Sequence, residues 1–328
     1  MFDKFKQSLL SGDVVAIPTE TVYGLAACIT SPEGIKKIFS TKERPFFDPL
    51  IVHISSVEMA KTVCSEWSPI AQALAQHYWP GPLSLVLPKA DTVNPMITSG
   101  LKTVGLRMPN HPLTLQLIHE LNTPLAAPSA NKFGKTSPTT SEHVRSEFGD
   151  TLLVLEGGSC DVGIESTILE IQNSNLIIHR KGQILKSDIE SFLKSKNIYF
   201  QFLENQEKDK IQTPGQVRHH YMPKIPLVLV KDIKSIPDLI SYIETQLQQL
   251  PNEIEGVRLI KPLSKIKNPQ ELRLPHNAHE ASRVLYSELR SLAESGADLM
   301  YFRLNNLHGD ESWGPIMDRL NRAASLIL

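Results

Sequence analysis

The sequence predicts an α/β protein of two domains, and three observations lead to this prediction. Over residues 1–202, short apolar runs typical of β-strands alternate with amphipathic stretches typical of helices. Several of the apolar runs are apolar on both faces, which is typical of a sheet covered by helices. The chain has 328 residues, which is enough for about two domains that each bury their own core.

The elements of the first domain can be placed from these runs. Strands are expected over 14–19, 49–54, 84–88, 103–109, 124–129, 151–158, 166–171 and 176–182. Helices are expected over 32–41, 56–64, 68–77 and 112–121. Thr139 and Glu142 have the spacing of a capping box, which predicts a helix that starts there and ends near Phe148.

A change in composition marks residues 203–225 as a linker. Its first part, ENQEKDK, is a charged run, and TPGQVRHHYMP contains proline and glycine, which break regular structure. Beyond it, further strands are expected over 226–230, 256–260 and 298–304. Helices are expected around Leu239–Leu247 and over 280–295 and 314–326. This alternation predicts a small Rossmann-like, three-layer α/β domain over 226–328.

The composition excludes some classes of protein. Hydrophobic residues make up 41% of the chain and charged residues 21%, which is typical of a globular protein. A net charge of -1 argues against a protein that holds RNA mainly by neutralising phosphates. Cys28, Cys64 and Cys160 form no metal or redox motif, so we interpret each as a small buried side chain. The N-terminus has no signal-peptide pattern and no run reaches the ~20 apolar residues of a membrane span, so a cytoplasmic location is expected.

The common nucleotide-binding and metal-binding motifs are not intact. Residues 134–136 end like a phosphate-binding loop, but Ser129 occupies the position where that loop needs its first glycine. His276 and His279 lack the further ligands that a metal site needs, so we interpret them as surface residues. The chemistry of this chain must therefore come from other residues.

Polar residues instead gather at the ends of apolar strands, where open α/β sheets bind their ligands. The segment PTETVYGL, residues 18–25, offers hydroxyl groups, although by itself it reads as an ordinary strand-to-helix loop. Lys42 and Arg44 are two positions apart and would point the same way from an extended segment. Such a pair can clamp a triphosphate or form a solvated basic patch.

Three later segments repeat this pattern. Arg107 lies inside an apolar strand, where a charge requires an anionic ligand or a buried carboxylate. The run PLAAPSAN ends in Ser129 and Asn131, which can hydrogen-bond a ligand without titrating or can form a common turn. Residues 163–168 and 179–182 each place a hydroxyl or a cation beside a glycine at a strand edge.

Together these segments resemble the Sua5/YrdC/YciO family. The motifs PTETVYGL, KERPFFDPLIVHI, WPGPLSLVL, VGLRMP, PLAAPSAN and GIESTI occur in the order and at the spacing of the family. The resemblance implies that residues 1–202 form a catalytic domain with a YrdC-type twisted, open, mixed sheet and flanking helices. It also implies that residues 203–225 form a lid over the active site and that 226–328 are the C-terminal domain of the long Sua5 form.

The same resemblance implies an activity. The family condenses L-threonine, bicarbonate or CO2 and ATP into threonylcarbamoyl-AMP and pyrophosphate, which is a nucleotidyltransferase reaction that serves the t6A37 modification of tRNA. Mg2+ is expected to be bound through the triphosphate rather than by a protein cage. A downstream threonylcarbamoyl transferase that acts on tRNA is the implied partner, with at most weak RNA contact by this chain and no membrane.

The resemblance also assigns roles to individual residues. The catalytic set falls on Lys42, Arg44, Ser129 and Asn131. L-Threonine is expected near Thr21, His53, Arg107, the backbone of Ala127, and Ser166. ATP is expected to contact Arg44, Asp48, Thr103, Ser129, Ser137, Arg180 and Tyr221. The linker departs from the family pattern SPGMKYRHYxP at Gln216, Val217, Arg218 and His219, which leaves open which linker side chain reaches the nucleotide.

Two other classes of function are compatible with the residues alone. One is a non-catalytic module that binds double-stranded RNA, against which the near-neutral charge argues. The other is an adenylating enzyme with a different acyl substrate. A substrate panel would separate the second from a threonine-specific enzyme.

Overall fold

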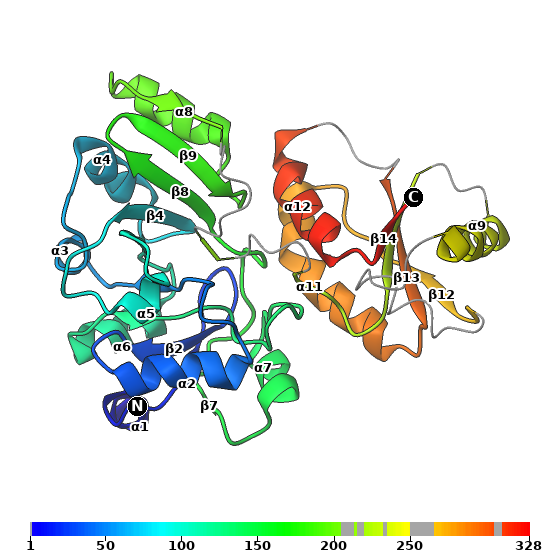
Figure 1. Cartoon of the computed structure of the whole chain (residues 1–328), viewed down its shortest axis with the longest axis horizontal. Coiled ribbons are helices and arrows are strands. Elements are labelled where there is room, and N and C mark those ends of the chain that lie inside the picture. The colour runs from blue at the N-terminus through cyan, green and yellow to red at the C-terminus, as the bar shows by residue number, and fades with distance from the viewer. Residues whose placement is uncertain (1, 205–212, 215–219, 232–234, 250–265, 305–309) are drawn as a thin grey trace. The chain divides into compact units, whose positions relative to one another are not determined.

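The structure is a computed structural model, and it describes residues 2–204, 213–214, 220–231, 235–249, 266–304 and 310–328. These residues form two compact units (Figure 1). Unit 1 comprises Met1–Phe133 with Ser137–Gln216, and unit 2 comprises Gly134–Thr136 with Val217–Leu328. The strand expected over 256–260 and most of the expected linker lie outside the described residues, so the domain boundaries and the lid stay predictions.

Unit 1 is built on a ten-stranded mixed sheet. Its strands are β1 (Val15–Ile17), β2 (Gly24–Cys28), β3 (Ile51–His53), β4 (Leu83–Pro88), β5 (Thr103–Arg107), β6 (Leu125–Ala126), β7 (Leu153–Val154), β8 (Thr167–Gln172), β9 (Asn175–Arg180) and β10 (Gln201–Phe202). They lie in the order β10–β9–β8–β4–β5–β3–β6–β2–β1–β7. Parallel pairs such as β3–β5 and β4–β8 stand beside antiparallel pairs such as β4–β5 and β8–β9, so the expected mixed sheet is confirmed.

The helices of unit 1 follow the sequence signals closely. They are α1 (Asp3–Leu10), α2 (Pro32–Lys42), α3 (Val57–Lys61), α4 (Pro69–Tyr78), α5 (Pro95–Thr98), α6 (Pro112–Leu121), α7 (Ser141–Phe148) and α8 (Lys186–Ser195). The predicted N-terminus of α7 is wrong by one residue, because the side chain of Thr140 rather than Thr139 accepts the capping hydrogen bond, from the His143 N–H. Helices α1, α5 and α8 were not expected.

The loop after β1 also differs from the expectation. It leads into the antiparallel strand β2, with Ile17 opposite Gly24, and not into a helix. Residues 18–23 are therefore the connection of a hairpin whose two strands lie inside the sheet.

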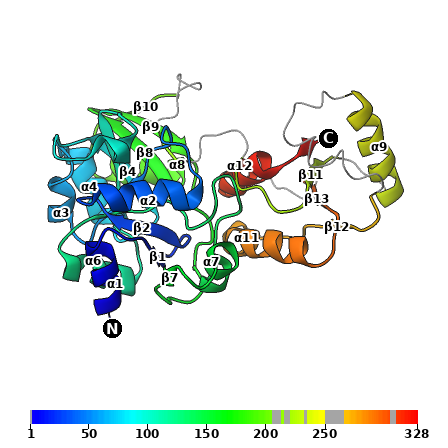
Figure 2. The ribbon, with the colours of Figure 1, turned by 60° about the horizontal axis from the view of Figure 1, so that its bottom comes forward.

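The two faces of the sheet are covered differently. One face packs against α2, α3, α4, α7 and α8 in the main hydrophobic core. On the other face, α1 and α6 cover β1, β2 and β6 (Figure 2). Among the described residues of unit 1, no helix covers that second face over β3, β4, β5 and β8.

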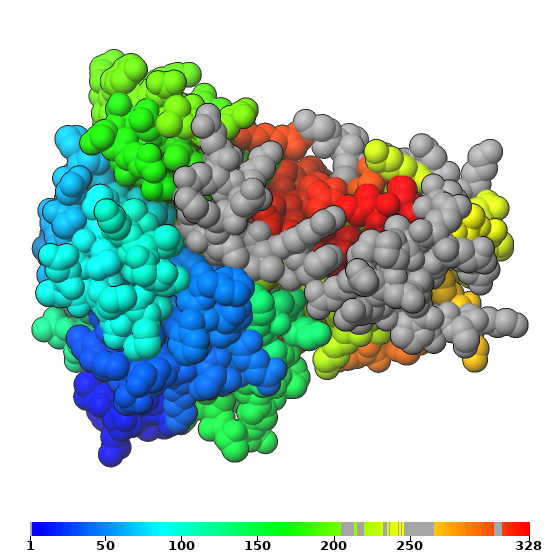
Figure 3. All heavy atoms as spheres, in the orientation of Figure 1, coloured from blue at the N-terminus to red at the C-terminus, as the bar shows by residue number. Residues whose placement is uncertain are grey.

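The β8–β9 hairpin and α8 lie at the opposite end of unit 1 from α1 (Figure 3).

Unit 2 contains a four-stranded, all-parallel sheet in the order β12–β13–β11–β14. Its elements are β11 (Leu227–Val230), α9 (Ile236–Gln249), β12 (Pro269–Glu271), α11 (Ala278–Glu294), β13 (Leu299–Arg303), η2 (Glu311–Trp313), α12 (Gly314–Ala323) and β14 (Leu326–Ile327). Helix α9 covers one face of this sheet, and α11 and α12 cover the other (Figures 1 and 2), as expected for three layers. The final helix ends earlier than expected, at Ala323, because the next residues form β14.

Two other expectations can be compared with the described residues. Cys28, Cys64 and Cys160 are all buried and unpaired, which confirms their interpretation as buried side chains. Among the helices of the described part of the chain, none combines the length and the apolar character that crossing a membrane requires.

Candidate functional site

The candidate site lies on the sheet face of unit 1 that the helices do not cover. We call it the open face for that reason, although side chains on it such as His53, Arg107 and Ser166 are buried. Side chains alternate along each strand, so Val104 and Leu106 of β5 enter the main core while Thr103, Gly105 and Arg107 share the open face. A side chain on Gly105 would clash with Ile51 of the adjacent β3, since its Cβ would lie 2.6 Å from the Ile51 Cδ1. With glycine at this position no side chain projects from the face, which lets a ligand approach the backbone.

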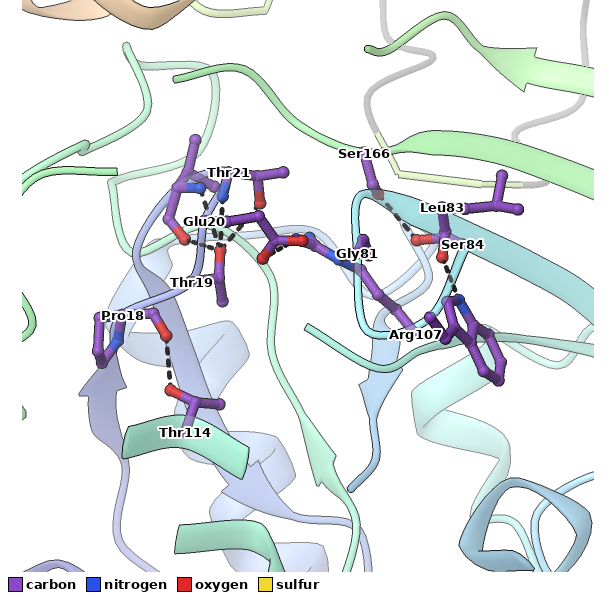
Figure 4. A network of polar contacts seen from close by, with 12 residues as sticks. Pro18, Thr19, Glu20, Thr21, Gly81, Leu83, Ser84, Arg107, Thr114 and Ser166 are labelled. Carbon is purple, nitrogen blue, oxygen red and sulfur yellow. Dashed lines mark hydrogen bonds and ion pairs between the residues drawn. The ribbon is translucent and has the colours of Figure 1, made fainter. Parts of the chain in front are cut away.

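At one end of this face, Arg107 forms a buried ion pair with Glu20 (Figure 4). The Arg107 Nη2 lies 2.7 Å from the Glu20 Oε2, and each side chain is only 5% exposed. The Arg107 Nε also donates to the carbonyl of Gly81 at 3.3 Å. The sequence predicted either an anionic ligand or a buried carboxylate beside Arg107; the structure shows a buried carboxylate, that of Glu20, which the sequence did not single out. The other carboxylate oxygen, Oε1, is buried without a hydrogen-bond partner among the described residues, which is rare unless a ligand uses it.

The loop that carries Glu20 is fixed by its neighbouring hydroxyls. The Thr19 Oγ1 donates to the Val22 carbonyl at 2.6 Å, and it accepts hydrogen bonds from the N–H groups of Thr21 and Val22, both at 3.2 Å. The hydroxyl of Thr21 lies 2.9 Å from that of Thr19 (Figure 4). The predicted threonine contact Thr21 is therefore adjacent to the Arg107–Glu20 pair.

His53 lies beside Arg107 at the end of the neighbouring parallel strand. Burial, and then the charge of Arg107, lower the pKa of His53 to about 3, while a hydrogen bond to the Ile51 backbone acts in the opposite direction. The imidazole is therefore neutral near neutral pH. Its Nδ1 is buried and has no hydrogen-bond partner among the described residues, so it can form a hydrogen bond with a ligand.

A separate set of hydrogen bonds spans the open face from β4 to β9. The hydroxyl groups of Ser84 and Ser166 lie 2.8 Å apart (Figure 4). Arg180 donates to Ser166 twice, to its hydroxyl at 3.1 Å and to its carbonyl at 3.0 Å. Gly182 allows this close packing, because a Cβ at that position would collide with the backbone of residues 165–167. Ser84 was not singled out in the sequence, because a single serine in an apolar strand does not by itself indicate a binding site.

A second group of charges, the cationic cluster Lys42, Arg44 and Arg180, acts on the carboxylate of Asp48. The Arg44 Nη2 lies 2.9 Å from the Asp48 Oδ2, with both side chains almost fully buried. Burial, and then the charge of Arg44, hold the pKa of Lys42 well below its ordinary value. Burial raises the pKa of Asp48, and Arg44, Lys42 and Arg180 act against that rise. The charges of the cluster are thus close enough to affect one another.

The end of α2 orients the two predicted phosphate ligands. Glu43 adopts a left-handed conformation, with φ of 54°, between Lys42 and Arg44. The ammonium group of Lys42 donates to the backbone carbonyls of Ser129 and Asn131. The structure therefore brings the predicted catalytic set together. It links Ser129 and Asn131 to Lys42 through their backbones, a contact that the sequence did not predict.

The remaining predicted residues are more widely distributed. Ala127 donates its N–H to the Ile51 carbonyl beside the open face. The Ser137 hydroxyl donates to the Glu165 carboxylate at 2.6 Å. Thr103 is at the far end of β5 from Arg107, where it lines a small cavity partly closed by Thr213–Pro214. Tyr221 belongs to unit 2, and Gln216–His219 lie outside the described residues.

The described residues provide no protein cage for a metal ion. No group of three or more His, Cys, Asp or Glu side chains among them could hold one. His276 and His279 are both exposed, which confirms their interpretation as surface residues.

Comparisons with known proteins match two family models to this chain. A family model of the Sua5, YciO and YrdC group, described as "Telomere recombination", matches residues 7–182. A second model, described as "Threonylcarbamoyl-AMP synthase, C-terminal domain", matches residues 184–325.

Two relatives are similar over nearly the whole chain. A protein named threonylcarbamoyl-AMP synthase from Bacillus subtilis is 35% identical over 96% of this chain and 90% of its own length. A protein of the same name from Pyrococcus abyssi is 34% identical over 95% of this chain and 91% of its own. The crystal structure of P. abyssi Sua5 complexed with L-threonine matches with a TM-score of 0.81 and 30% identity, and it covers 99% of this chain and 94% of that protein.

Proposed function

Because the chain belongs to the Sua5/YrdC/YciO family, we propose that it is a threonylcarbamoyl-AMP synthase. The enzyme uses ATP to join L-threonine and bicarbonate into threonylcarbamoyl-AMP. The observation that best supports this assignment is the open sheet face. It carries the Arg107–Glu20 pair and the neutral His53 at one end, and separately the hydrogen bonds that join Ser84, Ser166 and Arg180 of the cationic cluster.

The Arg107 end of the face suits an amino acid. A free amino acid carries a carboxylate and an ammonium group, and Arg107 and Glu20 present the complementary charges side by side. We assign the carboxylate of threonine to Arg107, whose planar guanidinium matches a carboxylate. The buried Oε1 of Glu20 is then available to the amino group, and the Nδ1 of His53 to a polar atom of the substrate. Thr21, Ser166 and the backbone of Ala127 complete the proposed threonine site.

The cationic cluster suits a triphosphate. Arg44 forms an ion pair with Asp48, and Lys42 and Arg180 act on the same carboxylate, so three basic side chains gather here. Such fixed charges, largely removed from water, stabilise negative charge that develops on phosphate oxygens. Because Lys42 is held by two backbone carbonyls, it does not have to be ordered when ATP binds. Thr103, Ser129, Asn131, Ser137 and, from unit 2, Tyr221 are proposed as further contacts to ATP.

The reaction needs no protein nucleophile. The uncharged amine of threonine attacks CO2, which dehydration of bicarbonate supplies, and it loses a proton to become an N-carboxylate. A carboxylate oxygen then forms a bond to the α-phosphorus of ATP while the bond from that phosphorus to the β-phosphate oxygen breaks. Threonylcarbamoyl-AMP, pyrophosphate and water are the products. The protein contributes positioning and charge stabilisation.

Three further features belong to the same proposal. Mg2+ would enter with the triphosphate, which together with water can supply most of its ligands. The product would pass to a threonylcarbamoyl transferase that modifies tRNA. The enzyme would work in the cytoplasm.

Pyrophosphate release from ATP tests the proposal, with L-threonine and bicarbonate each supplied or omitted. We expect release only when both are present. Release that needs bicarbonate but accepts another amino acid or carbamoyl phosphate in place of threonine would indicate an adenylating enzyme with a different acyl substrate. No release from a folded chain that fails to bind ATP but binds double-stranded RNA would contradict enzymatic function altogether.

A further inference from the structure

A second cavity with a charged wall lies in unit 2, within the C-terminal domain. It has a volume of about 280 Å³, near the lower end of the range for small-molecule sites. Its lining residues are Glu271, Leu272, Arg273, Leu274, Pro275, His276, Phe302, Arg303 and Trp313. None of the roles assigned above uses them.

The position of this cavity in the fold is the one where parallel sheets bind ligands. Glu271 is the last residue of β12, and Arg303 is the last residue of the adjacent parallel strand β13. Residues 272–277 connect β12 to α11, and Trp313 directly precedes α12. The cavity is therefore located outside the carboxyl ends of two neighbouring parallel strands, as in other open α/β sheets.

The charges of the wall favour an anion. Glu271 holds two arginines at once, with its Oε1 3.1 Å from the Arg303 Nε and its Oε2 3.3 Å from the Arg273 Nε. Both contacts use the inner nitrogens of the arginines. Among the described residues, no hydrogen bond or ion pair occupies the terminal guanidinium nitrogens of Arg273 and Arg303. Two cations share one carboxylate, which leaves an excess of positive charge at the cavity.

The rest of the wall is apolar and aromatic. Phe302 is 5% exposed and Trp313 6% exposed, so both rings are fixed by packing. Arg303 is held further by the ring of Tyr301, with its Cζ 5.9 Å from the ring centroid. A fixed guanidinium beside a rigid aromatic wall suits a ligand that has an anionic group and a flat apolar part.

We propose that this cavity is a second binding site, for a small organic molecule that bears a phosphate or carboxylate group. Arg303 and Arg273 bind the anionic group through their terminal nitrogens, and Trp313 contacts the remainder. The cavity shares no residue with the threonine and ATP sites proposed above, and its existence does not rest on the proposed synthase activity.

Tryptophan fluorescence of the full-length chain tests this proposal. The chain has three tryptophans, Trp67, Trp79 and Trp313, of which only Trp313 lines the cavity. The probes are AMP, pyrophosphate and succinate, each titrated at constant ionic strength, with isothermal titration calorimetry as a second measurement. We expect a saturable change in emission that Trp313→Phe abolishes. Arg303→Gln and Arg273→Gln should each weaken binding by about ten-fold, as expected when a hydrogen bond to a charged group is lost. The matched control is Arg283→Gln, an exposed arginine of α11 that does not line the cavity.

The outcomes separate the ligand sources and can overturn the proposal. Saturation by AMP or pyrophosphate but not by succinate assigns a phosphate ligand, and the reverse assigns a carboxylate. Binding that persists in Lys42→Ala but is weakened in Arg303→Gln places the ligand in unit 2. If Trp313→Phe fails to fold, calorimetry on the arginine variants decides instead. The proposal is wrong if no probe saturates, if Arg283→Gln weakens binding as much as Arg303→Gln does, or if Lys42→Ala abolishes all binding.

Discussion

The buried ion pair of Arg107 and Glu20 gives a sharp test of how the open face is held. Both side chains are only 5% exposed, and their charges lie 2.7 Å apart. Glu20→Gln would leave the guanidinium buried without its carboxylate, which should lower the free energy of unfolding of unit 1 by about 3–5 kcal/mol. Arg107→Met should lower the free energy of unfolding by a comparable amount, since it leaves the carboxylate of Glu20 buried without its guanidinium partner. The double variant removes both charges, so its loss should be smaller than the sum of the single losses by about 2–3 kcal/mol.

The measurement is urea unfolding in a Trp313→Phe background. In that background Trp67 and Trp79, both in unit 1, are the tryptophans that remain, so the fluorescence reports unit 1 alone. The control is Glu120→Gln, which breaks the Lys6–Glu120 pair at a similar distance of 2.8 Å but on the surface, where a smaller loss is expected. If the two single changes add in the double variant, or if Glu20→Gln costs no more than Glu120→Gln, the pair does not hold the site together.

Three further outcomes follow from the site. Lys42→Ala should reduce pyrophosphate release by about 10²-fold, whereas Lys36→Ala, at an exposed position of the same helix, should leave it unchanged. The pKa of His53 is lowered from 6.5 to about 3, so its neutral form stabilises the fold fully above pH 6.5, and this contribution is lost as the pH falls towards 3. The free energy of unfolding of the wild type should therefore fall as the pH is lowered from 6.5 to about 5. In His53→Gln this fall should be smaller by about 2 kcal/mol, measured by urea unfolding. Gly182→Ala should push its Cβ against the backbone at Ser166 and lower stability by about 1–3 kcal/mol together with activity, and unchanged thermal unfolding would contradict this contact.

Local signals in the sequence predicted the elements that depend on local chemistry. Helix α2 begins and ends close to the predicted limits, because Ser31 caps its first turn and Pro32 suits the first helical position. In α7, two adjacent threonines offered the same cap, and only the structure distinguishes Thr140 from Thr139. Strand β14 was missed because it is only two residues long and depends on pairing with β11, almost 100 positions earlier in the chain.

In the candidate site, too, the sequence predicted features that depend on local chemistry and missed contacts between distant residues. The unfavourable burial of Arg107 predicted a carboxylate partner, but its identity depends on a contact between residues 87 positions apart, which composition and spacing do not reveal. The link from Lys42 to the backbone carbonyls of Ser129 and Asn131 is also invisible in the sequence, because every residue has a carbonyl group. The resemblance to a family could suggest which residues gather, whereas their hydrogen-bond partners had to come from the structure.

The short last strand, β14, also affects how the protein behaves in concentrated solution. Its residues Leu326 and Ile327 pair with β11, whose sequence Leu-Val-Leu-Val is fully buried and flanked on its other side by β13. Without β14, the backbone N–H and C=O groups along one edge of this apolar strand would be exposed and able to pair with another chain. With it, the exposed edge is only two residues long, which is too short to template such a pairing. Leu326 and Ile327 therefore protect the C-terminal domain against aggregation through this edge. Deleting them, or attaching a bulky fusion partner next to them, is expected to reduce solubility.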